Sequence, residues 1–226
     1  MALQSINIGS AANDGTGSTL RAAFDICNDN FSELYGGTTS ALGFKSEGTN
    51  FTGSLIVGHS TTGTISSATY NTAFGIGAMD AITQGDYNVA IGYNAATTLT
   101  TGIRNVLIGG LAGDTMDTGT ENTIVGYSAG GGLTSGQYNV ALGAFSLAAE
   151  DAHGRNIAIG YYALGAQNAG ADAYNIAIGH SAGANISTGV RNTLVGGLAG
   201  DALTTGSYNT AVGYSALSTE DGDGRT

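Results

Sequence analysis

The sequence contains no proline, no tryptophan and only one cysteine, Cys27. A single cysteine excludes an intramolecular disulfide bond. The N-terminal residues MALQSINIGSAANDG lack a basic segment followed by an apolar one, and no stretch reaches about 18 consecutive apolar residues. We therefore expect neither a signal peptide nor insertion into a membrane.

Basic residues are also scarce. The chain has 6 Lys and Arg against 17 Asp and Glu, which gives a net charge of -11. This charge opposes binding to a phosphate backbone, so nucleic acid is excluded as a partner. Glycine, in contrast, is abundant at 39 residues. Glycine without proline favours tight backbone corners over a disordered chain.

One short phrase recurs along most of the chain. YNVAIGYNA at residues 87–95 is followed 17 residues later by RNVLIGGLA, then by ENTIVGYSA, and later copies continue to Asn209. Each copy starts at an Asn and has Gly four residues on, and the step is 17 residues except for a 19-residue step after Asn156. The repeat-defining residues of four central copies are Asn88, Gly92, Asn105, Gly109, Asn122, Gly126, Asn139 and Gly143.

A fixed short period predicts a repeat architecture in which each unit stacks on its neighbours. Seventeen residues are too few for a pair of helices, but they suit one turn of extended segments and corners. We therefore predict a mainly β fold. Residues 54–226 are expected to form a parallel β-solenoid, or β-roll, of about ten coils.

The predicted strands are apolar on both faces. After Asn88, the first and third residues, Val89 and Ile91, are expected to face the core. The second residue, Ala90, should point the other way, yet this position is apolar in every copy. A strand that is apolar on both faces must be buried on both. A single coil offers one core, so we expect other copies of the chain, in a homotrimer, to cover the second face.

Other positions of the repeat form regular columns. The residue six before each Asn is mostly a large apolar one, with Glu150 and Ala169 as exceptions, and should form a second wall of the core. The Asn column is expected to adopt left-handed turns and to stack as an amide ladder. The Gly column should supply a corner or a close contact.

Tyrosine or arginine precedes most of the repeated Asn residues. The tyrosines are Tyr70, Tyr87, Tyr138, Tyr174 and Tyr208, and the arginines are Arg104, Arg155 and Arg191. We predict a stacked surface stripe. Two hypotheses remain open for it, namely a simple packing ladder or a surface that binds sugar through Tyr87, Tyr138, Tyr174 and Tyr208.

Residues 1–37 differ in character from the repeats. An apolar seam of 4-3-4-3 spacing predicts one amphipathic helix that serves attachment and trimerisation, with residues 38–53 as a linker. Ser18 or Thr19 can cap its start and Gly36 can end it. The seam residues are Leu20, Phe24, Cys27, Phe31 and Leu34.

The NVAIG repeats resemble the head repeats of trimeric autotransporter adhesins, the YadA-like family, and similar repeats of bacteriophage tail fibres. This resemblance implies a trimer of β-rolls, although the period of 17 is longer than is usual in those heads. The NDGTG turn and the LRAAF helix start are similar to the N-terminal segment of many phage tail and fibre proteins. That segment would attach the chain to tail or other virion proteins.

These resemblances imply a structural fibre or appendage protein of a phage virion that contributes to host adsorption. The absence of a signal peptide favours this over an autotransporter, and the chain would be made in the host cytoplasm. The alternative is an adhesin that binds host-surface glycan or protein directly through the solenoid surface.

We expect no enzymatic activity and no cofactor. The acidic residues lie mostly in predicted turns, where solvated side chains are common. One turn, AAEDAHGRN at residues 148–156, combines Glu150, Asp151 and His153. One histidine and two acids are weak grounds for a metal site, so the sequence predicts none.

The last residues align with an internal copy. LSTEDGDGRT at 217–226 matches LAAEDAHGRN at 147–156, without a capping segment of different character after it. We expect this end of the solenoid to fray or to receive a partner protein at the distal tip.

Overall fold

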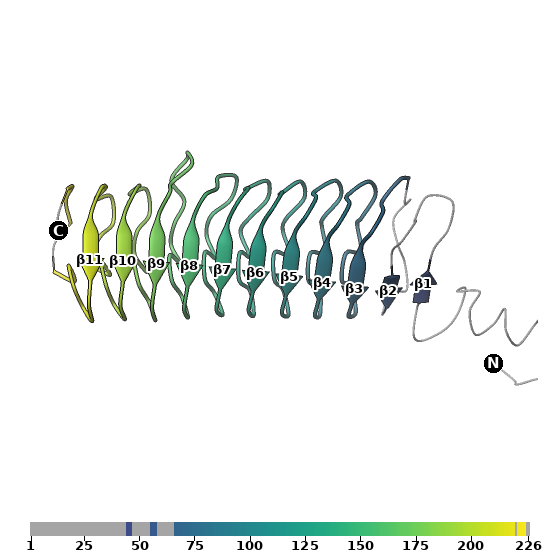
Figure 1. Cartoon of the computed structure of the whole chain (residues 1–226), viewed down its shortest axis with the longest axis horizontal. Coiled ribbons are helices and arrows are strands. Elements are labelled where there is room, and N and C mark those ends of the chain that lie inside the picture. The colour runs from purple at the N-terminus through teal and green to yellow at the C-terminus, as the bar shows by residue number, and fades with distance from the viewer. Residues whose placement is uncertain (1–43, 47–54, 58–65, 220, 225–226) are drawn as a thin grey trace, which may run out of the picture.

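The computed structural model describes residues 44–46, 55–57, 66–219 and 221–224. Within them the chain winds into a long coil whose strands lie side by side along its axis (Figure 1). The strands are β1 (Phe44–Ser46), β2 (Leu55–Val57), β3 (Thr72–Phe74), β4 (Val89–Ile91), β5 (Val106–Ile108), β6 (Thr123–Val125), β7 (Val140–Leu142), β8 (Ile157–Ile159), β9 (Ile176–Ile178), β10 (Thr193–Val195) and β11 (Thr210–Val212).

All the strands belong to one sheet in the order of the sequence. β1 is antiparallel to β2, and every later pair is parallel and in register, so that Val89 lies beside Val106 and Val106 beside Thr123. Repeat positions therefore stack directly on one another. The predicted parallel β-solenoid is confirmed, and its coils correspond to β2 to β11. The helix predicted within residues 1–37 lies outside the described residues.

The middle residue of each strand faces the core. Ala90, Leu107 and Ile124 are fully buried, whereas the flanking Val89 is half-buried and Ile91 is exposed. The predicted orientation of the strands was therefore wrong, because both faces are apolar and hydrophobicity alone cannot distinguish them.

Core volume is shared between two columns, the strand centre and the residue six positions later. Where the centre is Leu107 or Ile124, the second residue is glycine, and a Cβ on Gly113 or Gly130 would lie 2.7 Å from the Leu107 or Ile124 side chain. Where the centre is alanine, the second residue is larger in most coils, as in the pairs Ala73 and Met79, Ala141 and Leu147, Ala158 and Leu164, and Ala211 and Leu217. These coils thus fill a similar volume, whereas Ala90 with Ala96 and Ala177 with Gly183 do not follow the compensation.

The second wall of the core follows the prediction in most coils. Ile82, Leu99, Met116, Leu133, Ile186 and Leu203 are fully buried. In the 19-residue coil, the buried residue at the wall position is Gln167, not Ala169 as predicted. The two extra residues lie after Gln167, between the wall and Asn175, whereas counting back from the Asn placed them before it.

The Asn column forms the expected amide ladder. The backbone N–H and the Nδ2 of Asn122 both donate to Oδ1 of Asn105, at 3.0 and 3.1 Å. Its Nδ2 also donates to the Gly136 carbonyl at 2.8 Å. The asparagines are not left-handed, contrary to prediction. The left-handed residue is the one immediately before each of these asparagines, with φ of 57° at Arg104 and 58° at Tyr138.

The Gly column provides close contacts between coils, as predicted. Gly126 has φ of 143°, and a Cβ there would lie 2.6 Å from the backbone of Gly143 in the next coil. Side chains are therefore excluded both by the backbone angle and by the spacing of the coils.

The segment after β11 makes hydrogen bonds to the preceding coil. Oδ1 of Asp221 accepts the Thr204 and Gly206 backbone N–H groups at 3.1 and 2.9 Å, and Oδ1 of Asp223 accepts that of Ser207 at 2.7 Å. These carboxylates satisfy amides that would otherwise be exposed. These bonds cover part of the last coil, whereas fraying of this end and docking of a distal partner stay predictions.

Candidate binding surfaces

The first candidate surface is the outward face of the sheet, formed by the first and third residues of strands β2 to β11. Within these strands the outward residues are Val, Ile, Leu, Phe or Thr, without a charge. Phe74, Ile91, Ile178 and Val212 are exposed. Because the strands are in register, the face continues along the whole described coil as an uncharged strip.

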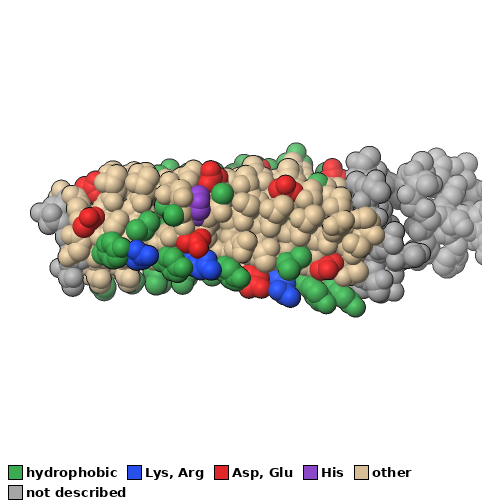
Figure 2. All heavy atoms as spheres, turned by 90° about the horizontal axis from the view of Figure 1, so that it is seen from above, with side chains coloured by type: hydrophobic (Ala, Val, Ile, Leu, Met, Phe, Trp, Pro, Cys, Tyr) green, Lys and Arg blue, Asp and Glu red, His purple; other side chains and the backbone are tan. Residues whose placement is uncertain are grey.

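The second surface is the Tyr–Arg stripe, which comprises the residues immediately before the Asn column. In Figure 2, basic and hydrophobic side chains alternate along one edge of the molecule. The rings of Tyr70 and Tyr87 stack at 4.9 Å, and the Arg155 guanidinium lies 5.0 Å from the Tyr138 ring. Arg104 forms a 3.0 Å ion pair with Glu121. The predicted stripe exists, and its members contact one another as a packing ladder would.

A third surface, the aromatic cluster, was missed at the sequence level. It consists of Tyr127, Phe145, Tyr161, Tyr162 and His180, which follow the corner glycines. Tyr127 and Phe145 pack edge-on at 5.5 Å, Phe145 and Tyr161 at 6.1 Å, and Tyr161 stacks on His180 at 5.3 Å. Tyr127 and Tyr161 are half exposed. The signal was the recurrence of Tyr at the fifth residue after Asn, at Tyr93, Tyr127, Tyr161 and Tyr214.

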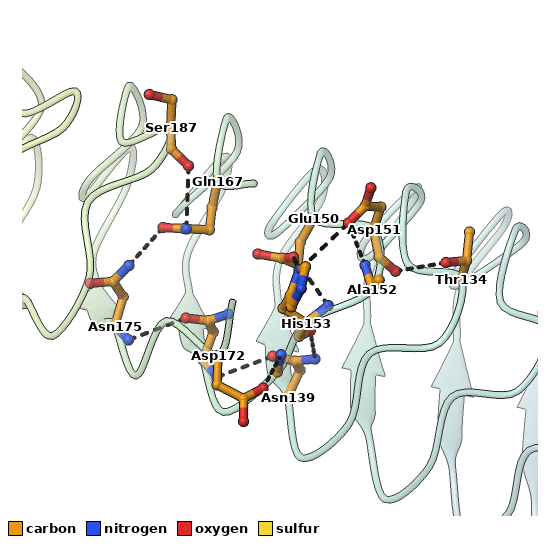
Figure 3. Close-up of polar contacts among 12 residues, drawn as sticks. Thr134, Asn139, Glu150, Asp151, Ala152, His153, Gln167, Asp172, Asn175 and Ser187 are labelled. Carbon is orange, nitrogen blue, oxygen red and sulfur yellow. Dashed lines mark hydrogen bonds and ion pairs between the residues drawn. The ribbon is translucent and has the colours of Figure 1, made fainter. Parts of the chain in front are cut away.

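A fourth surface is the acidic turn, Glu150 to His153 (Figure 3). Glu150 stands at a wall position and is fully buried. Its Oε1 accepts the His153 backbone N–H at 3.3 Å and lies 3.5 Å from His153 Nδ1. Asp151 is exposed, and its Oδ1 lies 3.8 Å from the same Nδ1. One oxygen from each acid thus faces one imidazole nitrogen.

Burial raises the pKa of the Glu150 carboxyl above its ordinary value. The hydrogen bond from the His153 backbone and the charge of His153 act in the opposite direction, and Asp151 adds to the increase. A buried carboxylate of this kind needs compensation by a proton, a hydrogen bond or a cation.

Comparisons of the chain with protein-family models, with curated proteins and with solved structures found no match. Among the residues placed by the structure, no helix is long and apolar enough to cross a membrane. The function must therefore be inferred from the four surfaces of this molecule.

The structure places the predicted site residues unevenly. The Asn column is buried, the Gly column is half-buried where the coils touch, and Tyr87, Tyr138, Tyr174 and Tyr208 lie on the stripe. The attachment residues Leu20, Phe24, Cys27, Phe31 and Leu34 fall outside the described part of the chain. Glu150, Asp151 and His153 come together, with one potential ligand atom of each within 4.8 Å of the other two.

Proposed function

We propose that the protein is a structural fibre or appendage subunit of a phage virion, and that it assembles as a parallel homotrimer through the outward face of its sheet. The observation that supports this most directly is the uncharged, apolar strip along the coil. An exposed apolar surface of this extent favours association over solvation.

A second copy of the same chain is the partner that fits the strip best. Parallel strands repeat at about 4.8 Å in every copy, so outward side chains of two solenoids can interdigitate over the full length. The net charge of -11 opposes self-association elsewhere on the surface, but the strip itself is uncharged. Three copies, rather than two, follow from the resemblance to trimeric β-roll heads.

Light scattering of the purified chain tests the assembly. We expect a mass about three times the 22.4 kDa of one chain. The double variant Ile91→Lys/Ile178→Lys should be monomeric, because two charges per chain would be buried at the interface. The matched control Thr118→Lys/Gln137→Lys adds the same charge at exposed turns and should stay trimeric. A folded monomeric parent would contradict the proposal.

The virion location needs a separate experiment. Peptides of this chain should be detectable in purified particles produced by the genome that encodes it, and antibodies against residues 66–219 should label an appendage in electron micrographs. Their absence from intact particles would overturn the virion role while leaving the assembly result unaffected.

The aromatic cluster supports a second candidate function, an adhesin that binds host glycan. Exposed tyrosine rings stack on sugar faces, and the cluster rings are not paired with arginine as several of those in the Tyr–Arg stripe are. Glycan-array binding that is lost in Tyr127→Ala/Tyr161→Ala but kept in Tyr87→Ala/Tyr138→Ala would support the cluster. The reverse pattern would assign binding to the stripe, and no binding would exclude the adhesin.

A further inference from the structure

The acidic turn departs from the repeat at two linked positions. In most other described coils the wall residue is Leu, Ile or Met and the third residue after it is glycine, as in Leu133 and Gly136 or Leu203 and Gly206. In this one coil the pair is Glu150 and His153. This coil thus has two side chains of metal-binding type where most other coils have a hydrophobic residue and a glycine.

The coil that follows makes room for the histidine. At Gly136 a Cβ would lie 2.4 Å from the next coil's carbonyl, which here belongs to His153. After His153, the two extra residues displace the corresponding corner, since a Cβ on Gly170 would have no described atom within 4 Å. Asn156 Nδ2 also lacks the carbonyl partner that Asn122 has. The insertion therefore opens the column at this point.

Two ligand atoms of the turn have no hydrogen-bond partner. Glu150 Oε2 and His153 Nδ1 are both buried and unpaired among the described residues. The next coil shows how a polar wall residue is otherwise satisfied, because Gln167 Oε1 accepts from Asn175 Nδ2 at 2.6 Å. Glu150 makes no matching bond to Asn156, whose Nδ2 is unpaired too. Its carboxylate lies instead beside the imidazole (Figure 3).

The separations suit a small cation. One ligand atom from each of Glu150, Asp151 and His153 lies within 4.8 Å of the other two, and Nδ1 is 3.5 and 3.8 Å from the carboxylate oxygens. Ligands at about 2.1 Å from a tetrahedral zinc ion are about 3.4 Å apart. Asp151 is exposed and His153 is partly exposed, so an ion can enter from solvent.

We propose that Glu150, Asp151 and His153 bind one divalent transition-metal ion, for which Zn²⁺ is the natural probe. One imidazole and two carboxylates are donors that such ions accept, whereas Mg²⁺ and Ca²⁺ prefer oxygen alone. The ion compensates the buried Glu150 carboxylate and fixes the turn beside the insertion. This revises the sequence-based expectation of no metal, which had no information on burial.

Calorimetric titration of the full chain with ZnCl₂ tests the proposal. We expect one Zn²⁺ per chain and a rise in Tm that EDTA reverses. The variant Glu150→Leu/His153→Gly restores the residues of the neighbouring coil, so it should fold without metal and lose both the binding and the Tm rise. If the metal-free variant shows a cooperative thermal transition, as expected, its loss of binding cannot be attributed to unfolding.

Asp117→Asn is the matched control. Asp117 occupies the same turn column as Asp151 but follows Met116 and precedes Gly119. It should bind Zn²⁺ as the parent does. Binding that persists in Glu150→Leu/His153→Gly, that is lost equally in Asp117→Asn, or that is absent from the parent would overturn the site.

Discussion

At the scale of single residues, the fold depends on positions where the backbone of one coil touches the next. Most of the corner glycines contact the glycine of the following coil, and the buried asparagines donate to the asparagine of the preceding coil. Each such residue serves two coils at once. A substitution at one position is therefore expected to affect stacking as well as its own turn.

The corner glycines allow a matched test of that contact. Gly126→Val should prevent folding or lower the free energy of unfolding by more than about 3 kcal/mol, because it adds a clash with Gly143 to the cost of a positive φ. Gly213 has φ of 125°, but a Cβ added there would have no described atom within 4 Å. Gly213→Val should therefore cost only about 1–3 kcal/mol. Equal losses in urea unfolding would contradict the role of coil contact.

Asp221 provides a prediction on pH. Hydrogen bonds from the Thr204 hydroxyl and backbone lower the pKa of Asp221 to about 2. A lowered pKa means that the ionised form is favoured by folding, so its contribution is present above about pH 4 and is lost as the pH falls through 2. The NMR amide shifts of Thr204 and Gly206 should titrate with a midpoint near 2. They should stop doing so in Asp221→Asn, and a midpoint near 4 would disprove the capping bond.

At the scale of the coil, the strand-centre residue and the residue six positions later must be considered together, because their side chains share one volume of the core. Gly130→Met alone should destabilise by about 1–3 kcal/mol through overpacking against Ile124, and Ile124→Ala alone by about 2–5 kcal/mol. The double variant recreates the pair of Ala73 and Met79, which another coil already uses, with Leu133 at the wall position in place of Ile82.

A double-mutant cycle in urea measures the coupling. We expect the combined loss to be smaller than the sum of the single losses by at least about 1 kcal/mol. Additive losses would mean that the two side chains do not share one volume.

The repeat period was sufficient to predict the coil type, the stacking and the asparagine ladder, because all three follow from a regular spacing. It was not sufficient to orient the strands. Val89 and Ala90 are both apolar, and only the compensation between Ala73 and Met79, or Leu107 and Gly113, distinguishes the inner column. That signal relates residues six positions apart, and their contact is recognised only when the path of the coil is known. The position of Gln167 was missed because the sequence does not say on which side of the wall the two extra residues lie.

The candidate sites were harder to predict for a related reason. The Tyr–Arg stripe repeats in one column and was found, whereas the aromatic cluster joins two columns on neighbouring coils. The acidic turn was recognised by its residue types. The proposal of a metal site there depends on the burial of Glu150, which the sequence does not reveal.

At the scale of the whole molecule, every coil has the same rise and the same register. Deleting Asn88–Tyr138 removes three coils and joins Tyr87 to Asn139, which reproduces the Tyr–Asn junction that is already present. This variant should fold, and its maximum dimension by small-angle X-ray scattering should be shorter by about 14 Å. Deleting Asn88–Leu133 ends within a coil and should abolish folding. If both deletions fold equally well, the register does not constrain the chain.

Because the coils stack in register, the length of the molecule is set by the number of repeats. Unequal crossing-over between two copies of the repeat inserts or removes whole units without disturbing the asparagine ladder. Length can therefore change in steps of about 4.8 Å while every lateral surface keeps its chemistry. Reach and surface specificity are then separately variable in descendants of such a gene, since one depends on how many units are present and the other on which residues decorate them.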